Sequence, residues 1–590
     1  MDSTSRADGV DSAASAEQVV ADGMVIEWDV PIEMDDGLVL RADVFRPIQD
    51  GRYPVIMAMG PYAKGLAFQE GYKGNWDRMV AAYPEIAEGT TNKYQNWEEV
   101  DPEKWVPDGY ACVRVDSRGA GRSPGYLDIW SPRENQDFFH CIEWAAEQEW
   151  SSGRVGLLGI SYYAMNQWYV ASLQPPHLSA ICVWEGAADY YRDLCRHGGI
   201  LSEFLAGWFP RQVLRVQHGV GERGPRSAVT GKPVAGPETL TEAELAANHS
   251  DPGGEVRARP LDGDYYRERS PKYDRITVPL LSSGNWGGQG LHPRGNIEGY
   301  LSAASEQKWL EMHGDTHFSP FYSNRGVALQ KRFFGHFLKG EDNGWESQPP
   351  VQLQVRHPGE RFVPRAENEW PLARTQWTKF YLDPKDRSLS REPVDGEPVQ
   401  YAATGDGVTF LSPTLTEDVE ITGPVAAKLF LSSDTTDADV FLVLQVFDPD
   451  GEEVVFIGSN DPRTPVGLGW LRASQRKLDQ ERTLPYRPFH PHDEVWPLEP
   501  GQPVELDVEI WPTCIVVPAG YRFGLAVRGK DYENDGVDVP GAMYPMKGTG
   551  PFLHGDPTDR PADVFGGTNT LHFSGGRHPY VLLPVIPPTA

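Results

Sequence analysis

The feature that most constrains this chain is a sharp turn at Gly159–Tyr163, placed between a short apolar run and a segment of helical composition. The run Val155–Ile160 predicts a strand, and the residues after the turn, up to Trp168, favour a helix. The turn reads Gly-Ile-Ser-Tyr-Tyr, which is the G-x-S-x-G pattern of a nucleophile elbow with the last glycine replaced. An elbow of this kind strains the serine backbone and lifts the hydroxyl above the sheet edge. Ser161 is therefore the candidate nucleophile.

A serine hydroxyl is a weak nucleophile, so Ser161 needs partners. It requires a base, an acid that orients the base, and donors for the oxyanion that forms on the substrate. The helix after the elbow directs its free N–H groups and the positive end of its dipole toward the serine. The backbone N–H of Tyr162 is thus one expected oxyanion donor. A histidine, a carboxylate and a second donor must come from elsewhere in the chain.

Length, charge and cysteine usage narrow the class of protein. A chain of 590 residues is too long for one core, so we expect two or three domains. The net charge of −30 repels polyanions and no basic stripe offsets it, which disfavours nucleic-acid binding. No run of about 18 apolar residues occurs, so we expect no membrane span. The five cysteines are few, odd in number and scattered, which favours reduced thiols and a cytoplasmic location.

Strands and helices alternate in the first 345 residues. Two alternating segments around Asp36-Gly37 predict a hairpin. Apolar runs then predict strands at Pro54–Met59, Ala111–Val115, Val155–Ile160, Leu178–Val183, Val278–Ser282 and Lys308–Met312, with helices at Asp137–Glu147 and Val327–Leu338. This order is typical of an α/β protein with a parallel sheet covered on both faces.

The composition divides the chain into four parts. We expect residues 1–22 to be a disordered N-terminal segment and residues 23–192 with 273–345 to form an α/β-hydrolase domain. Residues 193–272 mix helical stretches with Gly and Pro, and predict a helical cap inserted over the sheet edge. Residues 350–590 contain short strands, Val454–Ile457 among them, with no helical pattern. They predict an all-β sandwich, of a jelly-roll, galactose-binding-like kind.

His317 is the best candidate for the base. It follows the strand Lys308–Met312 by a short loop, and in α/β-hydrolases the histidine comes after the serine and the acid, on a late loop. An ordinary loop histidine is the alternative. A metal pair of His313 and His317 is a further alternative, but no third ligand is evident nearby, so we expect no metal and no cofactor.

The second oxyanion donor usually comes from the loop after the third strand. Here that loop reads Gly60-Pro61-Tyr62, and the Tyr62 phenol could donate. Packing beneath the cap is an equal alternative for Tyr62 on these grounds alone.

Three motifs together resemble one family. Gly60–Lys64, the turn Asp116–Ser123 (D-S-R-G-A-G-R-S) and Gly159–Tyr163 are similar to segments of the CocE/NonD hydrolases, relatives of cocaine esterase and X-prolyl dipeptidyl aminopeptidase. The resemblance covers nearly the whole chain, including a C-terminal jelly roll. It implies that Ser161 and His317 are the nucleophile and base. It also implies that Tyr62 gives an oxyanion-hole hydroxyl and Tyr162 a backbone N–H.

The chain departs from this family at the acid. The family's acid normally lies in a G-W-x-D motif, whereas this chain reads Gly284-Asn285-Trp286-Gly287, with Gly287 at the aspartate position. No carboxylate occurs between Asp274 and Glu298. Glu185 is the first substitute, because it follows the neighbouring strand at the same sheet edge. A structural role under the cap is its alternative, and the next candidates are Asp189, Glu298 and Asp315.

The sequence therefore predicts a serine hydrolase that cleaves an acyl ester or amide through an acyl-enzyme. An X-Pro dipeptidyl-peptidase is the first alternative, and a decayed hydrolase that acts as a binding protein is the second. The expected partner is a small ester, amide or short peptide, with no nucleic acid and no membrane, and a homodimer remains open.

Overall fold

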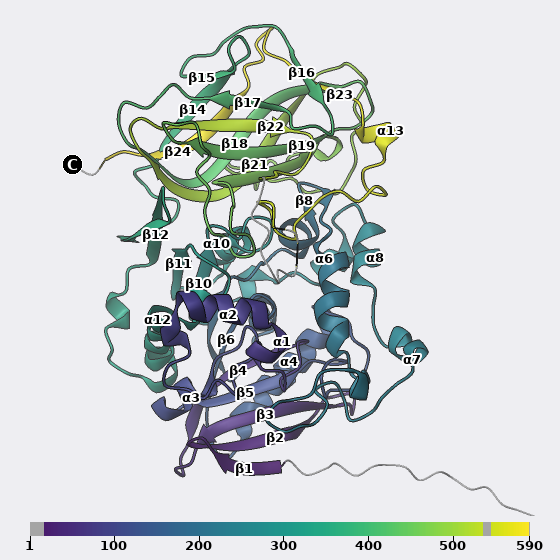
Figure 1. Cartoon of the computed structure of the whole chain (residues 1–590), viewed down its shortest axis with the longest axis vertical. Coiled ribbons are helices and arrows are strands. Elements are labelled where there is room, and N and C mark those ends of the chain that lie inside the picture. The colour runs from purple at the N-terminus through teal and green to yellow at the C-terminus, as the bar shows by residue number, and fades with distance from the viewer. Residues whose placement is uncertain (1–16, 535–543, 545, 589–590) are drawn as a thin grey trace, which may run out of the picture.

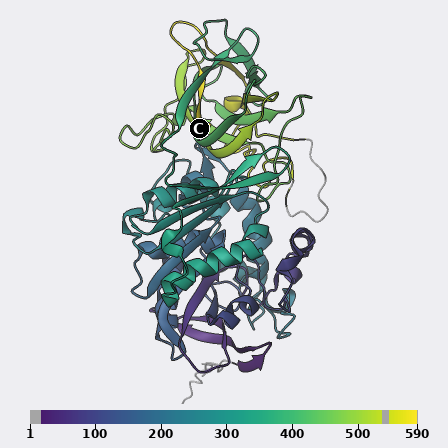
Figure 2. The same ribbon diagram turned by 90° about the vertical axis from the view of Figure 1, so that its left-hand side faces the viewer.

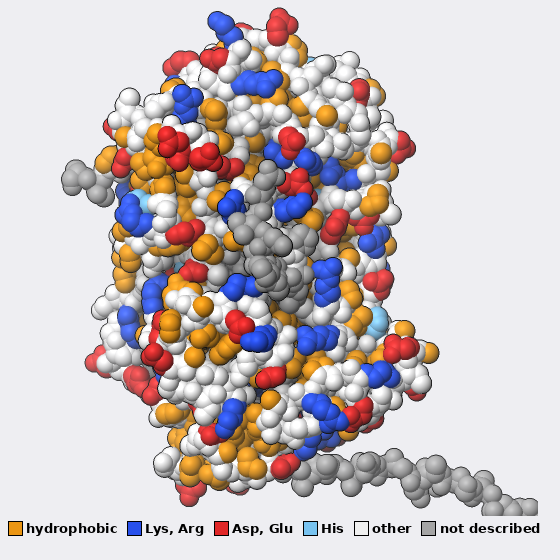
Figure 3. All heavy atoms as spheres, viewed as in Figure 1, with side chains coloured by type: hydrophobic (Ala, Val, Ile, Leu, Met, Phe, Trp, Pro, Cys, Tyr) orange, Lys and Arg blue, Asp and Glu red, His pale blue; other side chains and the backbone are white. Residues whose placement is uncertain are grey.

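A computed structural model of the chain describes residues 17–534, 544 and 546–588. Two parts are stacked along the long axis of the molecule: an α/β-hydrolase part, and a C-terminal β domain at the end opposite the N-terminal strands (Figures 1 and 2). Acidic and basic side chains are interspersed over the face seen in Figure 3. No helix in the described ranges is both long and apolar enough to cross a bilayer.

The hydrolase sheet has parallel strands at its centre and antiparallel ones at its margins. From one edge to the other its order is β1 (Glu17–Ala21), β2 (Met24–Glu33), β3 (Val39–Pro47), β5 (Ala111–Asp116), β4 (Tyr53–Gly60), β6 (Ser151–Ile160), β7 (Leu178–Trp184), β10 (Leu280–Asn285), β11 (Lys308–His313), β12 (Val351–His357) and β13 (Arg361–Glu367). In this spatial order the strands from β5 to β12, which are β5, β4, β6, β7, β10, β11 and β12, run parallel, so their carboxyl ends meet at one edge. Functional residues of α/β proteins gather at such an edge.

Helices cover both faces of this sheet. The main ones are α4 (Pro132–Glu147), α5 (Tyr162–Ser172), α10 (Pro293–Ser302) and α12 (Asn324–Phe334). Helix α4 starts before the predicted Asp137, because Ser131 caps it by accepting a hydrogen bond from the Glu134 N–H and Pro132 occupies its first turn. The apolar sides of these helices pack on the strands and bury large cores on the two faces of the sheet.

Two long connections hold many short helices. Residues 66–108 contain α1 (Phe68–Gly71), α2 (Lys73–Ala82) and α3 (Pro102–Trp105). Residues 190–275 contain a π-helical turn at Tyr190–Cys195, the short strands β8 (Arg196–His197) and β9 (Ile200–Leu201), α6 (Phe204–Trp208), α7 (Glu242–Ala247), α8 (Pro252–Arg257) and α9 (Asp264–Arg267).

The regular elements of the C-terminal domain are mainly strands, joined by long loops. They are β14 (Gln376–Asp383), β15 (Ser388–Ser390), β16 (Val399–Ala402), β17 (Val408–Leu411), β18 (Val419–Ser433), β19 (Asp439–Phe447), β20 (Gly467–Arg472), β21 (Val504–Val517), β22 (Arg522–Arg528), β23 (Thr568–Leu571) and β24 (Tyr580–Ile586). Antiparallel pairs such as β18–β21 and β19–β22 enclose a separate apolar core. A bridge between Arg356 of β12 and Ile515 of β21 links the two parts.

Two sequence predictions are corrected here. Disorder through residue 22 is wrong for Glu17–Ala21, which pair with β2, while residues 1–16 lie outside the described residues. The predicted strand Val454–Ile457 does not form. Its Phe456 enters the β-domain core, but the chain then turns away at Gly458 toward the hydrolase sheet. Tertiary contacts thus override the β propensity of this apolar run.

Candidate active site

The elbow lies between β6 and α5. Ser161 has φ 56° and ψ −110°, a backbone conformation that non-glycine residues rarely adopt. Its N–H donates to the carbonyl of Trp184 on the adjacent strand, at 3.1 Å. Within Val155–Ser172, all of which the structure describes, only Ser161 is not buried. The strained turn therefore exposes this hydroxyl from an otherwise buried strand and helix.

The altered last position of the elbow has a steric explanation. Tyr163 stands where the pattern has glycine, and its ring lies against Gly60, where a Cβ would come within 2.5 Å of Tyr163 Cε1. Gly159 is equally constrained, since its Cβ would meet that of Tyr163 at 2.4 Å. The tyrosine is thus accommodated by the glycine at the end of β4.

Both expected oxyanion donors lie at this elbow. The Tyr62 ring is in edge-to-face contact with the rings of Tyr162 and Tyr163, at centroid distances of 5.9 and 5.7 Å. The Trp208 indole N–H donates to the Tyr62 phenol oxygen at 3.2 Å, which leaves the phenol proton free to be donated. Burial raises the pKa of Tyr62 well above its usual value, so the phenol stays protonated. Tyr162 begins α5, where backbone N–H groups lack partners within the helix.

The turn Asp116–Ser123 fixes the loop that carries Tyr62. The Asp116 carboxylate accepts hydrogen bonds from the backbone N–H groups of Lys64 at 2.7 Å and Arg122 at 2.8 Å. Gly121 has φ 53°, and a Cβ there would lie 2.2 Å from Asp116 Oδ2. Two motifs distant in sequence are thereby held together beside the elbow.

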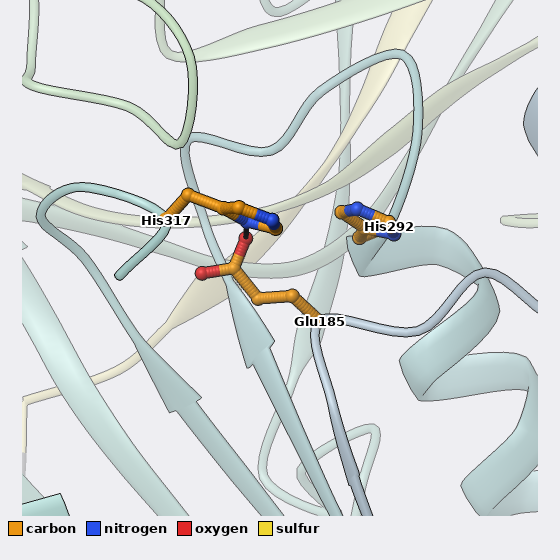
Figure 4. A group of neighbouring side chains, drawn as sticks. All are labelled: Glu185, His292 and His317. Carbon is orange, nitrogen blue, oxygen red and sulfur yellow. Dashed lines mark hydrogen bonds and ion pairs between the residues drawn. The ribbon is translucent and has the colours of Figure 1, made fainter. Parts of the chain in front are cut away.

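His317 and Glu185 form a buried pair (Figure 4). Nδ1 of His317 lies 2.7 Å from Glu185 Oε2, and Figure 4 shows the carboxylate pointing at the imidazole. The other Glu185 oxygen, Oε1, is 3.2 Å from Asn285 Nδ2 and 3.3 Å from His313 Nε2. Burial alone raises the pKa of Glu185, but the charges and hydrogen bonds of His317 and His313 outweigh it and bring the pKa below its usual value. Glu185 is therefore an ionised carboxylate aimed at His317.

The other nitrogen of His317 also faces a carboxylate. Nε2 lies 3.0 Å from Oε1 of Glu98, whose side chain is buried in the connection that precedes β5. Burial lowers the pKa of His317, but Glu185 and then Glu98 raise it to about 10. Within the part of the chain that the structure describes, no hydrogen bond joins the Ser161 hydroxyl to His317. The carbonyl of Glu98 accepts from Ile160 N–H at 3.0 Å, so the Glu98 segment lies directly beside the elbow.

The other candidate acids are engaged elsewhere. Asp189 pairs with Arg192 at 2.9 Å and Glu298 with Arg487 at 2.9 Å, while Asp315 contacts the Tyr83 phenol. None of these contacts reaches His317. Of the sequence candidates, Glu185 is the carboxylate that the fold brings to this histidine.

A possible ligand set for a metal includes the same pair. Glu185, His292 and His317 each present a ligand atom within 4.8 Å of the others, and the two imidazoles are stacked at 5.4 Å. Two ligands about 2.1 Å from a tetrahedral zinc ion would be about 3.4 Å apart. The 2.7 Å separation of Glu185 and His317 is shorter, and fits a shared proton rather than a shared ion.

A cavity of about 230 Å³ opens beside His317. Its wall includes the flanking residues Thr316 and Phe318, Trp97 next to Glu98, and Ser459 from the β domain. The wall is mostly apolar. A substrate group held here would lie next to the imidazole.

Sequence reasoning missed Glu98, Ser459 and Trp208. Glu98 lies in a connection that carries no motif, and Ser459 follows an apolar run that was predicted to be a strand. Trp208 is one of many aromatic residues in the predicted cap. No local pattern distinguishes these residues, because each reaches the site only through tertiary folding.

Comparisons with known proteins find related hydrolases over nearly the whole chain. A family model described as X-Pro dipeptidyl-peptidase (S15 family) matches residues 36–319, and one described as the C-terminal non-catalytic domain of X-Pro dipeptidyl-peptidase matches 343–582. A CocE/NonD family hydrolase of Staphylococcus aureus, known from its crystal structure, is 30% identical, with 98% of each chain covered and a TM-score of 0.82. Cocaine esterase of a Rhodococcus species is 26% identical, with 85% of this chain and 90% of the esterase covered. An aminopeptidase of a marine sediment archaeon has the same fold, at 14% identity, 99% and 100% coverage and a TM-score of 0.67.

Proposed function

We propose, from the premise that this chain belongs to the CocE/NonD family of serine hydrolases, that Ser161, His317 and Glu185 are its catalytic triad. The chain is an enzyme that hydrolyses ester or amide bonds. The observation that carries the triad assignment is the 2.7 Å contact between Glu185 and His317 at the sheet edge that carries the elbow.

The proposed reaction has two halves. Ser161 Oγ attacks the substrate carbonyl carbon, and its proton passes to Nε2 of His317. The oxyanion receives hydrogen bonds from the Tyr62 phenol and the Tyr162 N–H. His317 then protonates the leaving alcohol or amine, and an acyl-enzyme remains. Water, deprotonated by the same imidazole, attacks the acyl group and releases Ser161.

Glu98 imposes a condition on this reaction. The base must be a neutral imidazole with an open Nε2, whereas the contact with Glu98 favours the imidazolium. Burial raises the pKa of Glu98, so the shared proton can pass to Glu98 or the carboxylate can move away when substrate enters. Glu185 meanwhile keeps Nδ1 in the donor role that the mechanism needs.

The substrate is a small ester, amide or short peptide. The mostly apolar cavity beside His317 suits the acyl part of such a molecule, and we propose aryl and alkyl esters as the first class. The matching family model is described as an X-Pro dipeptidyl-peptidase, so cleavage of X-Pro peptides is the alternative activity. The rates of hydrolysis of Gly-Pro-p-nitroanilide and of a p-nitrophenyl ester distinguish peptidase from esterase activity. A decayed, non-catalytic hydrolase is not favoured, because a carboxylate other than the one in the G-W-x-D motif lies against the histidine.

The finer features of the architecture and setting are also proposals. We propose that residues 193–272 act as a cap over the cleft and that the C-terminal β domain is a jelly roll. A cytoplasmic location and a homodimer are proposed on sequence grounds alone.

The test is hydrolysis of p-nitrophenyl acetate by the wild type and by Ser161→Ala. We expect turnover to fall to the level of the uncatalysed reaction while the circular dichroism spectrum stays unchanged. A fluorophosphonate should label the wild type and not the variant. Undiminished hydrolysis by Ser161→Ala would refute the assignment.

A further inference from the structure

One loop of the C-terminal domain reaches the centre of the catalytic site. It comprises residues 457–461 and leaves the β domain after Phe456, which remains in the β-domain core. Residues of this loop line the cavity beside His317, and Ser459 among them is buried. Its placement therefore depends on the β domain, while its tip contacts residues of the hydrolase sheet.

Ser459 contacts both members of the His–Glu pair. Its hydroxyl donates to Glu185 Oε2 at 2.8 Å, and this is the same oxygen that lies 2.7 Å from His317 Nδ1. The backbone carbonyl of Ser459 accepts a hydrogen bond from the backbone N–H of His317 at 3.1 Å. One residue of the β domain thus fixes the backbone of the histidine and the carboxylate of the acid.

Two glycines allow the loop to approach so closely. A Cβ on Gly287 would lie 2.3 Å from Gly458 Cα, and one on Gly458 would lie 2.5 Å from the Gly287 carbonyl oxygen. The Ser459 N–H then donates to that carbonyl at 3.2 Å. Gly287 follows Trp286 in the segment that resembles the family's acid-bearing motif, and the loop occupies the space into which a side chain at 287 would extend.

Hydrogen bonds within the β domain also restrain this loop. The carbonyl of Asp461 accepts from the Gly458 N–H at 2.8 Å. The Asp461 carboxylate accepts from the N–H groups of Gly548 and Gly550 at 2.7 and 3.1 Å. These bonds restrain the loop from the β-domain side, so the Ser459 hydroxyl is preorganised and does not depend on one flexible side chain.

We propose that Ser459 is a positioning residue for Glu185, and that the β domain thereby completes the catalytic site. This inference rests on the proposed triad. A hydroxyl is suited to the task because it is neutral: it donates to the carboxylate without competing electrostatically for the charge that stabilises His317. With Ser459 in place, Oε2 has two donors and its direction toward Nδ1 is fixed.

The first experiment removes the hydroxyl. In Ser459→Ala we expect kcat/KM for a p-nitrophenyl ester to fall about tenfold, mainly in kcat, because one charge-assisted hydrogen bond is lost. The acid limb of the kcat/KM profile should move to higher pH, since the less solvated carboxylate holds the proton on His317 more strongly. Ser459→Thr keeps a hydroxyl, and its methyl group has the adjoining cavity to enter, so it should restore most of the rate.

A matched control separates this role from loss of packing. Ser474 is also a buried serine of the β domain, and its hydroxyl donates to a carboxylate, that of Asp437. Ser474→Ala should lower thermal stability without changing the pH profile. A wild-type kcat and pH profile in Ser459→Ala would overturn the proposal, as would an equal loss in Ser459→Thr with an intact fold.

A double-variant cycle links the effect to Glu185. Ser459→Ala should cost nothing further in a Glu185→Gln background, because the carboxylate it positions is gone. A tenfold loss in both backgrounds would show that Ser459 does not act through Glu185 and would overturn this inference while leaving the nucleophile assignment intact. Full activity in Ser161→Ala would instead refute the proposed function itself.

Discussion

The carboxyl ends of β7 and β10 are adjacent, yet they differ in what they contribute. The strands pair in parallel with Ser283 opposite Trp184, so the residues just beyond them reach the same place at the sheet edge. After β7 the chain carries Glu185, and after β10, in the segment that resembles the family's G-W-x-D motif, it carries Gly287 and Gly288 and no carboxylate. The imidazole stays on the loop after β11 in either arrangement. In the proposed triad the base thus lies on the loop after β11, and the acid follows β7, one strand away from the segment that resembles the family's motif.

What fills the vacated position matters as much as where the carboxylate lies. At Gly287 the backbone of Gly458 takes the space of a side chain and brings Ser459 to Glu185. The end of β10 therefore keeps a supporting role through Asn285 and through the loop it admits. In this chain a proposed acid after β7 is thus accompanied by a close contact of the β domain with Gly287.

The largest expected effect tests the β7 end. Glu185→Gln should lower kcat by about 10⁴, because the amide no longer enforces the tautomer and charge of His317. The measurement is kcat for a p-nitrophenyl ester, with folding checked by thermal unfolding. Glu298→Gln is the matched control, since Glu298 was also a candidate acid but pairs with Arg487, and it should stay near the wild type. Equal losses in the two variants would mean that the triad has no preference for the β7 carboxylate.

The second prediction tests whether the two ends are interchangeable. Gly287→Asp should reduce kcat/KM about 100-fold and the free energy of unfolding by about 1–3 kcal/mol, because the new side chain meets Gly458 Cα at 2.3 Å. In the double variant Glu185→Gln/Gly287→Asp we expect no recovery. Gly263→Asp is the control, since a Cβ there meets nothing within 4 Å. Recovery of tenfold or more over Glu185→Gln would show that the acid can return to β10 without a change in the loop.

The third prediction concerns the two carboxylates on the one imidazole. Glu98 helps to raise the pKa of His317, so removing its charge should lower that pKa. Since the proposed mechanism uses neutral His317 as the base, the acid limb of kcat/KM in Glu98→Gln should move to lower pH, by about one pH unit. Activity below neutrality would then rise relative to the wild type. A limb that stays in place would mean that Glu98 does not hold the proton on His317 in the free enzyme.

The parts of this site that depend on local sequence patterns and on strand order could be predicted from the sequence. The elbow at Ser161 was predictable because it is a contiguous pattern, and the order of strands placed Glu185 and His317 at one edge. Glu98 and Ser459 could not be predicted to lie at the site. Each contacts residues that are hundreds of positions away in the sequence, and Glu98 also lies in a segment that carries no motif. The run Val454–Ile457 shows the reason: its apolar composition predicts a strand, and only the contact at Gly287 explains why the chain leaves the domain there.

The smallest expected effect tests the residual role of β10. Asn285 donates to Glu185 Oε1 at 3.2 Å and to the Asp315 carbonyl at 2.7 Å, so it links the acid to the loop that carries His317. Asn285→Ala should lower kcat about threefold with KM unchanged, because one neutral donor of several is lost. Asn569→Ala, a buried amide in β23, should leave kcat unchanged. A loss in kcat near that of Glu185→Gln would contradict this prediction. It would mean that the position of the Glu185 carboxylate depends mainly on Asn285, so that the end of β10 contributes as much to the acid as the end of β7.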